Sequence, residues 1–393
     1  MLMAYDYQFP NPKILNDLND EYRITFIKTV TALRNRICRL TQHDIVLIES
    51  RHGKYLPRVV DGLNVLKVSP TQMPLPISIK FYWLFFLKYR RYNRLSRYIL
   101  SLIRITKARV VLSTDAISQL TEIKKANSNV EVIAVMHGLY IAQPDELRIR
   151  EAWKDKEDSE VTLFSLGEYD KSHYERWGNH HSLIIAAGSL NDSIYRTLPT
   201  TNSRSKFDIC VVEGSVDPLA QKQFAKIRLS NWIKITEFVK RIADQYDLKI
   251  IVALSQSTKK DAVRQWFASR FDDNLCFVDD SKEFATYRAI DEALISIGET
   301  STSLIEGLSR GNKILSLNFT DSTLLDLPVH PINRLHQPSY TIFQNHFHNL
   351  LNMSEDNYQN LTRESSYFLN SYDLASSTHV MLRRFIETTI LGQ

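Results

Sequence analysis

The chain has 393 residues, of which 44% are hydrophobic and 24% are charged, and this balance excludes an intrinsically disordered or low-complexity protein. Its length suits two domains of ordinary size. The formal net charge of +5 is mildly basic, which fits either a protein without charged partners or one that prefers phosphate-bearing ligands or an anionic membrane face.

The cysteines and the N-terminus indicate a cellular compartment. Cys38, Cys210 and Cys276 are far apart in apolar contexts and lack the spacing of metal ligands. Buried, reduced thiols of this kind are usual in the cytoplasm. The first residues, MLMAYDYQFPNPK, have no apolar core of signal-peptide length, so we expect a cytoplasmic protein.

The first half of the chain predicts a parallel sheet. A helix is expected over 13–40, and apolar runs separated by helical or polar stretches follow at 44–50, 109–113, 130–136, 161–166 and 183–188. Buried strands that alternate with crossover segments are typical of parallel α/β sheets.

A polar segment around 190–206, which contains Pro199, indicates an interdomain linker. An amphipathic helix over 219–246 and apolar runs follow it, the runs at 207–212, 248–254, 275–278, 294–297 and 313–317. We predict an α/β protein of two Rossmann-like domains with a cleft between them. The predicted parts are a domain over 1–195, a domain over 206–370, and a C-terminal helix in 371–393 that can pack back on the first domain.

Residues 79–105, IKFYWLFFLKYRRYNRLSRYILSLIRI, are unusually basic and aromatic. If this segment forms one helix, its apolar side carries Phe85, Tyr89, Tyr92, Ile99 and Ile103. Its other side carries Arg90, Arg94, Arg97 and Arg104. Frequent Lys and Arg exclude a membrane-spanning helix. The pattern fits either a packed helix with a solvated basic face or a helix on an anionic membrane surface, and no motif indicates nucleic-acid binding.

The run VIAVMHGLY (132–140) predicts a strand that ends in His137 and Gly138. Ligands of α/β sheets bind beyond the carboxyl ends of the strands, and Gly138 permits a close approach to the backbone. His137 is therefore a candidate general base toward an acceptor hydroxyl. A hydrogen-bonded structural histidine is the alternative.

The segment LISIGETSTSLIEGLSRGNKILSLN (294–318) carries the strongest signal for a site, because it predicts strand, turn, helix, glycine and strand. After the turn at Gly298, the helix start is crowded by Glu299, Thr300, Ser301, Thr302 and Ser303. Free N–H groups and hydroxyls there can bind phosphate, and Glu306 can accept hydrogen bonds from a ribose. The alternative is simple N-capping, which accounts for one hydroxyl residue but not for four in a row.

Three further loops that follow predicted strands supply weaker candidates. Glu49 and Asp115 are candidate catalytic carboxylates of the first half. Candidate acceptor-binding residues are Arg51, His52 and Lys54, and candidate nucleotide-binding residues are Glu213, Gly214 and Ser215. A charged or small-residue surface loop is the alternative for each.

Several motifs are missing from the sequence. It has no Asp-x-Asp triplet, by which many sugar transferases hold a divalent metal. It also lacks the Gly-x-Gly-x-x-Gly, Walker and Gly-x-Ser-x-Gly patterns, which disfavours a dehydrogenase, an ATPase and an α/β-hydrolase. We expect neither a metal nor a cofactor, with the activated nucleotide donor acting as a substrate.

The order of these motifs resembles the GT-B-type transferases of bacterial surface polymers, which include the CDP-glycerol glycerophosphotransferases of teichoic acid synthesis and the sugar transferases of capsule and lipopolysaccharide. The segments that carry the resemblance are IVLIESRHGKYL (45–56), VIAVMHGLY (132–140), LFSLGEYDKSHYERWG (163–178), IIAAGSLNDSIY (184–195) and the 294–318 segment. The chain departs from the alditol-phosphate transferases in two places. After His-Gly those enzymes carry a small residue, Pro and Lys, whereas this chain has Leu139-Tyr140-Ile141. They also carry a His-Pro pair after a strand of the second half, whereas the His-Pro pair of this chain, His330-Pro331, lies beyond the Ser/Thr helix.

The resemblance and these departures together imply a glycosyltransferase. It would move a sugar from a nucleotide-sugar donor, for example a CMP-linked acidic sugar, onto a surface-polysaccharide or lipid-linked glycan. The domain over 206–370 is then expected to bind the nucleotide donor and the domain over 1–195 the acceptor, in the cytoplasm or at the inner face of its membrane. Two alternatives stay open: a CDP-alditol phosphotransferase of teichoic-acid type, and a non-catalytic binding protein with the same fold.

Overall fold

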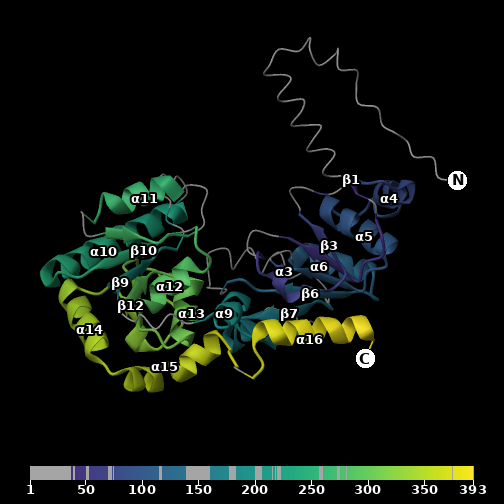
Figure 1. Cartoon of the computed structure of the whole chain (residues 1–393). Helices are drawn as coiled ribbons and strands as arrows, with labels where there is room; N and C mark the ends of the chain where they lie inside the picture. Colours follow the sequence, from purple (N-terminus) through teal and green to yellow (C-terminus); the bar gives the residue numbers. More distant parts are fainter. Residues whose placement is uncertain are drawn as a thin grey trace, which may run out of the picture.

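The computed structural model describes most of the chain and shows two α/β halves next to each other (Figure 1). The described residues are 37–38, 40–49, 53–69, 73, 75–114, 117–138, 160–176, 183–199, 206–214, 216, 218, 223–255, 260–271, 275–279, 281–373 and 375–392. A short parallel pair, β1 (Ile37–Cys38) with β4 (Leu75–Pro76), lies beside the first half.

The first half is built on six parallel strands in the spatial order β3-β2-β5-β6-β7-β8. They are β2 (Ile45–Ile48), β3 (Val65–Val68), β5 (Val110–Ser113), β6 (Glu131–Val135), β7 (Thr162–Ser165) and β8 (Ile184–Ala186). Successive residues of a strand point to opposite faces, so Val46 and Ile48 join the core on one face while Ile45 and Leu47 join the core on the other. Both faces of this sheet are thus buried, as parallel sheets require.

Helices cover the two faces of this sheet. The helices of the first half are α3 (Leu56–Val59), α4 (Ile79–Trp83), α5 (Arg94–Thr106), α6 (Ile117–Ala126), α8 (Glu168–Arg176) and α9 (Leu190–Tyr195). The C-terminal helix α16 (Thr378–Leu391) also packs here, since Leu382 and Ile386 are fully buried with Ile45 and Leu47. In Figure 1 this helix (yellow) runs along the first half, although the chain enters it from the second.

The second half has six parallel strands in the order β11-β10-β9-β12-β13-β14. They are β9 (Phe207–Val212), β10 (Ile250–Ala253), β11 (Leu275–Phe277), β12 (Ala293–Gly298), β13 (Ile314–Asn318) and β14 (Arg334–His336). Its helices are α10 (Gln223–Tyr246), α11 (Lys260–Ala268), α12 (Ala285–Asp291), α13 (Thr302–Ser309), α14 (Tyr340–Asn352) and α15 (Glu355–Leu369). This strand order is that of a doubly wound Rossmann sheet, so the predicted fold class is confirmed.

Three predicted elements are wrong in detail. The expected helix over 13–40 lies outside the described residues except at its end, where Ile37–Cys38 is a strand. The segment expected as a linker from residue 190 begins with α9, whose Asp192 is fully buried. The single helix expected over 79–105 is divided into α4, the π-helical turn η1 (Leu84–Lys88) and α5.

The break between η1 and α5 has a local cause. Asn93 is the N-cap of α5 and accepts a hydrogen bond from the backbone N–H of Ser96 at 2.9 Å. The break lets α5 pack in the core while α4 and η1 take another direction. Within the described residues, none of these or the other helices combines the length and the apolar character that crossing a bilayer needs.

Candidate functional site

The winding of each sheet reverses at one place, and three of the predicted site residues directly follow strands at these switch points. The reversal falls between β2 and β5 in the first sheet and between β9 and β12 in the second. Glu49 directly follows β2, Glu213 directly follows β9, and Glu299 directly follows β12. Ligands of open α/β sheets bind at the carboxyl ends of the strands where the order reverses, so this is the expected edge for a site in each half.

An arginine of α10 joins the two loops at the switch point of the second half. The Arg228 guanidinium donates to Glu299 Oε2 at 2.6 Å, to Thr300 Oγ1 at 3.3 Å and to the carbonyl oxygen of Gly214. Asn231, almost one turn further along the helix, donates to Glu299 Oε1 at 2.7 Å. The structure therefore brings together Gly214, Glu299 and Thr300, through a residue that the sequence interpretation missed.

The two carboxylates of these loops hold protein groups. Glu299 is fully buried, and burial raises its pKa while Arg228 and Asn231 work in the opposite direction. Glu213 is 3% exposed and accepts the backbone N–H of Ser255 at 2.8 Å and that of Val216. Both side chains fix the shape of the turns, so a ligand at this edge would meet backbone groups and hydroxyls before it met either carboxylate.

The start of α13 differs from a simple capped helix. Ser301 is the N-cap in an extended conformation, but its hydroxyl makes no capping hydrogen bond. The Thr300 hydroxyl accepts from Arg228 instead. N-capping by these hydroxyls therefore does not account for the run of Ser and Thr. Ser301, Thr302 and Ser303 are half-buried at the positive end of the helix dipole, where an anion is favoured.

Gly138, which directly follows His137, reaches this helix start from the other half. Both residues follow β6 at the carboxyl edge of the first sheet, and His137 is half-buried. A Cβ placed on Gly138 would lie 3.1 Å from Thr302 Oγ1, which is tighter than most side-chain contacts. The glycine thus permits the loop of the first half to touch the start of α13.

The other predicted residues of the first half are less well defined. Glu49 is half-buried, and its backbone N–H donates to the carbonyl oxygen of Val68 at 2.8 Å. Lys54 is exposed, with its ammonium 4.7 Å from the centre of the Tyr55 ring. Outside the described residues lie Arg51, His52, Asp115 and Ser215. The proposed roles of all these residues stay predictions.

Glu306 lies between the two halves and away from the turn. It is 2% exposed and accepts a hydrogen bond from the hydroxyl of Ser189, the N-cap of α9. Burial and the neighbouring carboxylate of Asp192 raise its pKa to about 7. A ribose would have to displace Ser189 from this carboxylate, so we do not carry a ribose-binding role forward.

A cation and two aromatic rings complete this interface. Arg310 donates to Asp192 Oδ1 at 2.7 Å and to Asp291 Oδ1 at 2.9 Å. Its guanidinium lies 5.1 Å from the ring centre of Tyr195 and 4.8 Å from that of Tyr287. Nearby, Tyr55, the N-cap of α3, stacks on Phe284 with ring centres 4.5 Å apart. The interface between the halves is thus a packed one with a buried polar centre.

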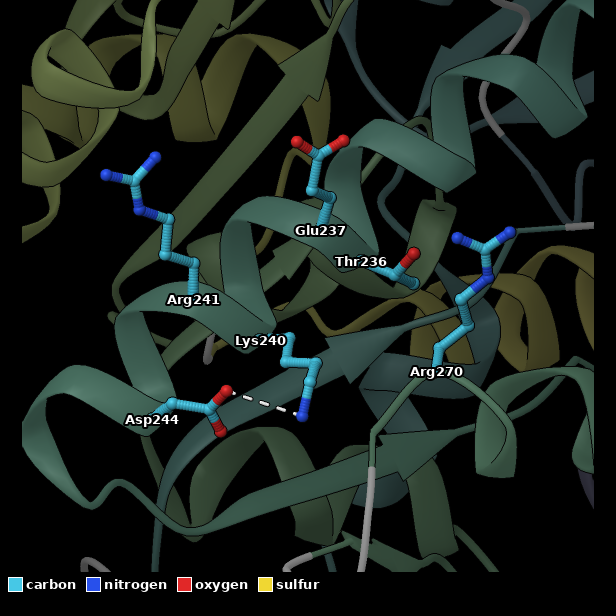
Figure 2. Close-up of a pocket in the computed structure, with 6 residues that line it drawn as sticks. All are labelled: Thr236, Glu237, Lys240, Arg241, Asp244 and Arg270. Carbon is cyan, nitrogen blue, oxygen red and sulfur yellow. Dashed lines mark ion pairs between the residues drawn. The ribbon is translucent and has the colours of Figure 1, made fainter.

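A surface hollow elsewhere on the second half contains none of the predicted site residues (Figure 2). It has a volume of 490 Å³ and is lined by Thr236, Glu237, Lys240, Arg241, Asp244 and Arg270. Its charges are mixed, and Lys240 pairs with Asp244 at 3.3 Å. Across the part of the chain that the structure describes, no three His, Cys, Asp or Glu side chains gather as a metal site would require.

Comparisons with known proteins bear on the fold. No protein-family model and no curated protein matches the sequence. A glycosyltransferase from Rickettsia africae is 11% identical, with 89% of this chain and 99% of that chain covered and a TM-score of 0.51. A UDP-GlcNAc 2-epimerase from Methanocaldococcus jannaschii is 14% identical, with 89% of this chain and 99% of that chain covered and a TM-score of 0.53. A UDP-GlcNAc 2-epimerase from Neisseria meningitidis is 12% identical, with 91% of this chain and 100% of that chain covered and a TM-score of 0.50. These likenesses concern the fold alone, and the chain has the two-domain GT-B fold that its motif order implied.

Proposed function

We propose that this protein is a GT-B-type glycosyltransferase that takes a sugar from a nucleotide-sugar donor and passes it to a surface-polysaccharide or lipid-linked glycan. The observation that supports the proposal is the close approach of Gly138 to Thr302 at the start of α13, because the proposed base His137 directly precedes Gly138. A donor bound at one side and an acceptor at the other would meet at this contact.

The start of α13 is the proposed place of the donor diphosphate or monophosphate. Its N–H groups and the hydroxyls of Ser301, Thr302 and Ser303 provide hydrogen bonds to phosphate oxygens. The helix dipole stabilises the negative charge that develops on the leaving phosphate. This arrangement supplies charge stabilisation from the chain itself, and we propose that no metal or cofactor takes part.

His137 is the proposed general base. Its imidazole is able to accept the proton of the acceptor hydroxyl as that oxygen attacks the anomeric carbon, because a neutral imidazole nitrogen carries a lone pair that accepts a proton. Arg228 is a positioning residue in this scheme, since it fixes Gly214 and Thr300 beside the proposed phosphate position. Closure of the halves on the donor would exclude water and limit donor hydrolysis.

The nucleotide is open to direct test. A CMP-linked acidic sugar is one donor that the resemblance allows, and the M. jannaschii epimerase of the same fold has been solved with UDP-GlcNAc and UDP. Purified protein would be supplied with CMP-, UDP- and GDP-sugars and with CDP-glycerol, and donor cleavage would be measured with and without glycan acceptors. Cleavage of CDP-glycerol alone would favour the alditol-phosphate alternative, and interconversion of free nucleotide sugars would favour an epimerase.

Two variants test the proposed geometry. We expect His137→Ala to lower kcat by about 100-fold to 10,000-fold, with little change in donor binding. We expect Thr302→Glu to weaken donor binding at least about tenfold, because it places a negative charge at the proposed phosphate position while suiting a helix start.

His43→Ala is the matched control, since His43 precedes β2 at the opposite edge of the first sheet and makes a hydrogen bond with Asn64. Full activity of the His137 variant would remove the role of general base from His137. Donor binding by the parent chain without cleavage of any donor would instead favour the alternative of a non-catalytic binding protein.

A lipid-linked acceptor would determine where in the cell the protein acts. Such glycans are held at the inner face of the cytoplasmic membrane, so the proposal places the protein in the cytoplasm at that face. The half that we assign to the acceptor also contains the basic aromatic segment.

A further inference from the structure

The surface of α4 and η1 carries a cluster of exposed apolar side chains. We name as the α4–η1 face the residues Ile77, Ile79, Tyr82, Trp83, Phe86 and Leu87. Ile79 is 91% exposed, and Trp83, Phe86 and Leu87 are each more than half exposed. In the part of the chain that the structure describes, these six are among 15 large hydrophobic side chains at the surface, all six within eleven residues. Exposed apolar side chains are usually scattered, and a contiguous group of them marks an interaction surface.

The opposite side of the same segment fixes this face in place. Phe81 and Leu84 are each 2% exposed and belong to the core of the first half. The Phe81 ring packs edge-on against Tyr98 of α5, with ring centres 5.3 Å apart. Burial of Phe81 and Leu84 directs positions 79, 82, 83, 86 and 87 outward, because these positions recur at helical spacing on the other side. The apolar residues are therefore held at the surface by the fold, with one stripe inside and one outside.

The apolar side chains of 79–105 that are exposed to a partner differ from the stripe predicted for a single helix. The stripe expected from a single helix, Phe85 to Ile103, faces the protein: Tyr89, Ile99 and Ile103 are buried, and Phe85 is half-buried under Arg97. The exposed stripe is the other one, on α4 and η1. A surface for a partner exists here only because the chain breaks at Asn93.

The charge around the face is of one sign. Between residues 62 and 114 the sequence has ten Lys and Arg and neither Asp nor Glu, in a protein whose total charge is only +5. Lys80, Lys88, Arg90, Arg91 and Arg94 on and beside the face are exposed. Glu122 of α6 contacts this region and accepts a hydrogen bond from Asn93. A partner of this surface must offer apolar material and negative charge together.

We propose that the α4–η1 face docks on an anionic lipid bilayer, with Trp83 and Phe86 entering the interfacial zone and the neighbouring Lys and Arg contacting headgroup phosphates. Trp and Tyr favour the boundary between headgroups and acyl chains, and basic side chains beside them add attraction to anionic lipid. Aliphatic Ile77, Ile79 and Leu87 fit acyl chains, whereas bases of a nucleic acid stack on aromatic rings and gain little from aliphatic groups. The docking is independent of any transfer reaction, so it can fail or hold separately from the proposed enzyme.

The test uses the full chain and vesicles, without any donor. Sedimentation would compare vesicles of phosphatidylcholine alone with vesicles in which about a third of the lipid is phosphatidylglycerol. We expect binding to the anionic vesicles only, reduced by salt. The variant Trp83→Ser/Phe86→Ser should bind at least about tenfold more weakly, with an unchanged melting temperature because both side chains are exposed. The variant Lys88→Gln/Arg90→Gln/Arg91→Gln should lose most of the salt dependence.

The matched control removes apolar surface elsewhere. Ile342→Ser/Leu361→Ser changes two exposed aliphatic side chains of the second half and should bind vesicles as the parent does. Equal binding by the Trp83/Phe86 variant, or no binding of the parent chain to anionic vesicles, overturns the proposal. Binding of single-stranded oligonucleotide, or dimer formation, that the same variant abolishes in the absence of vesicle binding also overturns it and identifies the other partner.

Discussion

Glu299 and Glu306 lie less than two helical turns apart, and both are buried, yet they belong to different parts of the molecule. Glu299 is held by Arg228 and Asn231 of the same half. Glu306 contacts Ser189 of the other half and lies beside Asp192. One short hydroxyl-rich segment therefore builds the turn of the proposed donor site at its start and connects the two halves further along.

The two carboxylates also differ in charge balance. Glu299 has one guanidinium within hydrogen-bonding distance and is matched by it. Around Glu306, the carboxylates of Asp192 and Asp291 already share Arg310, and Arg196 also pairs with Asp192 at 3.0 Å. Burial and the nearby Asp192 raise the pKa of Glu306 to about 7, although Ser189, Tyr287 and Arg310 work in the opposite direction. The comparison distinguishes a carboxylate paired with a guanidinium at the turn from a carboxylate beside another carboxylate at the interface.

Removal of the central arginine of each cluster should have the largest effect. Arg310→Met leaves Asp291 without its cation and Asp192 with Arg196 alone, and Arg228→Met leaves Glu299 without its cation. A broken buried ion pair costs about 3–5 kcal/mol, so urea unfolding should show losses of this size for both. Only Arg310→Met should separate the unfolding of the two halves into two transitions, because Arg310 serves the interface.

The control for these variants is Lys234→Met on α10, which removes an exposed pair with Glu237 and should cost less than about 1 kcal/mol. Equal, single-step unfolding of both arginine variants would contradict the distinction between a turn cluster and an interface cluster.

Neutral replacement of the two glutamates should separate them by pH. The pKa of Glu306 is raised from 4.5 in the unfolded chain to about 7 in the fold. The folded state therefore holds this proton more tightly, and its stability falls as pH rises from about 4.5 to about 7, by about 3 kcal/mol, with no further loss above that range. Glu306→Gln should remove this loss and be more stable than the parent chain above pH 7.

Glu299→Gln should behave in the opposite way. It leaves Arg228 buried without its carboxylate, so it should destabilise the protein by about 2–4 kcal/mol at neutral pH. Both variants are tested by urea unfolding at a series of pH values between about 4.5 and about 7, which gives the free energy of unfolding at each pH. An identical pH slope for Glu306→Gln and the parent chain would show that Asp192 or another group takes the proton.

Much of the fold could be predicted because its central strands are short apolar runs with polar ends. β9, β10, β12 and β13 lie where such runs were found, since strands buried on both faces have little other composition. The edge strands β3 and β14 were missed: they are short, and Lys67 and Arg334 at the sheet edge interrupt the apolar pattern.

The site was predictable only where it is local. Residues at strand ends, such as Glu213 and Glu299, could be named from the sequence because a strand end is a local feature. Arg228 could not, since nothing near it in α10 distinguishes it from other helix residues. The polar residues of α9 resemble those of a solvated linker, because Arg310 and Asn370, which donate to the buried Asp192, are distant in the sequence. The Asn93 cap was a local signal that could have shown the break in 79–105.

Loss of one hydrogen bond in each cluster should give the smallest and sharpest contrast. Ser189→Ala removes a bond to Glu306 and the cap of α9, at a cost of about 1–2 kcal/mol, while Thr300→Val removes one long bond from Arg228, at about 0.5–1 kcal/mol. The Ser189 hydroxyl stabilises the ionised carboxylate, so its loss should raise the pKa of Glu306 further and move the pH-dependent loss of stability upward. Thr300→Val should leave the pH dependence of the unfolding free energy unchanged.

In a double-mutant cycle, the effects of Ser189→Ala and Glu306→Gln on the unfolding free energy should be non-additive because the two side chains share one hydrogen bond, whereas the effects of Thr300→Val and Glu306→Gln should add. Additivity of the first pair would mean that the serine acts on α9 alone, and that the interface is held by Arg310 without help from Glu306.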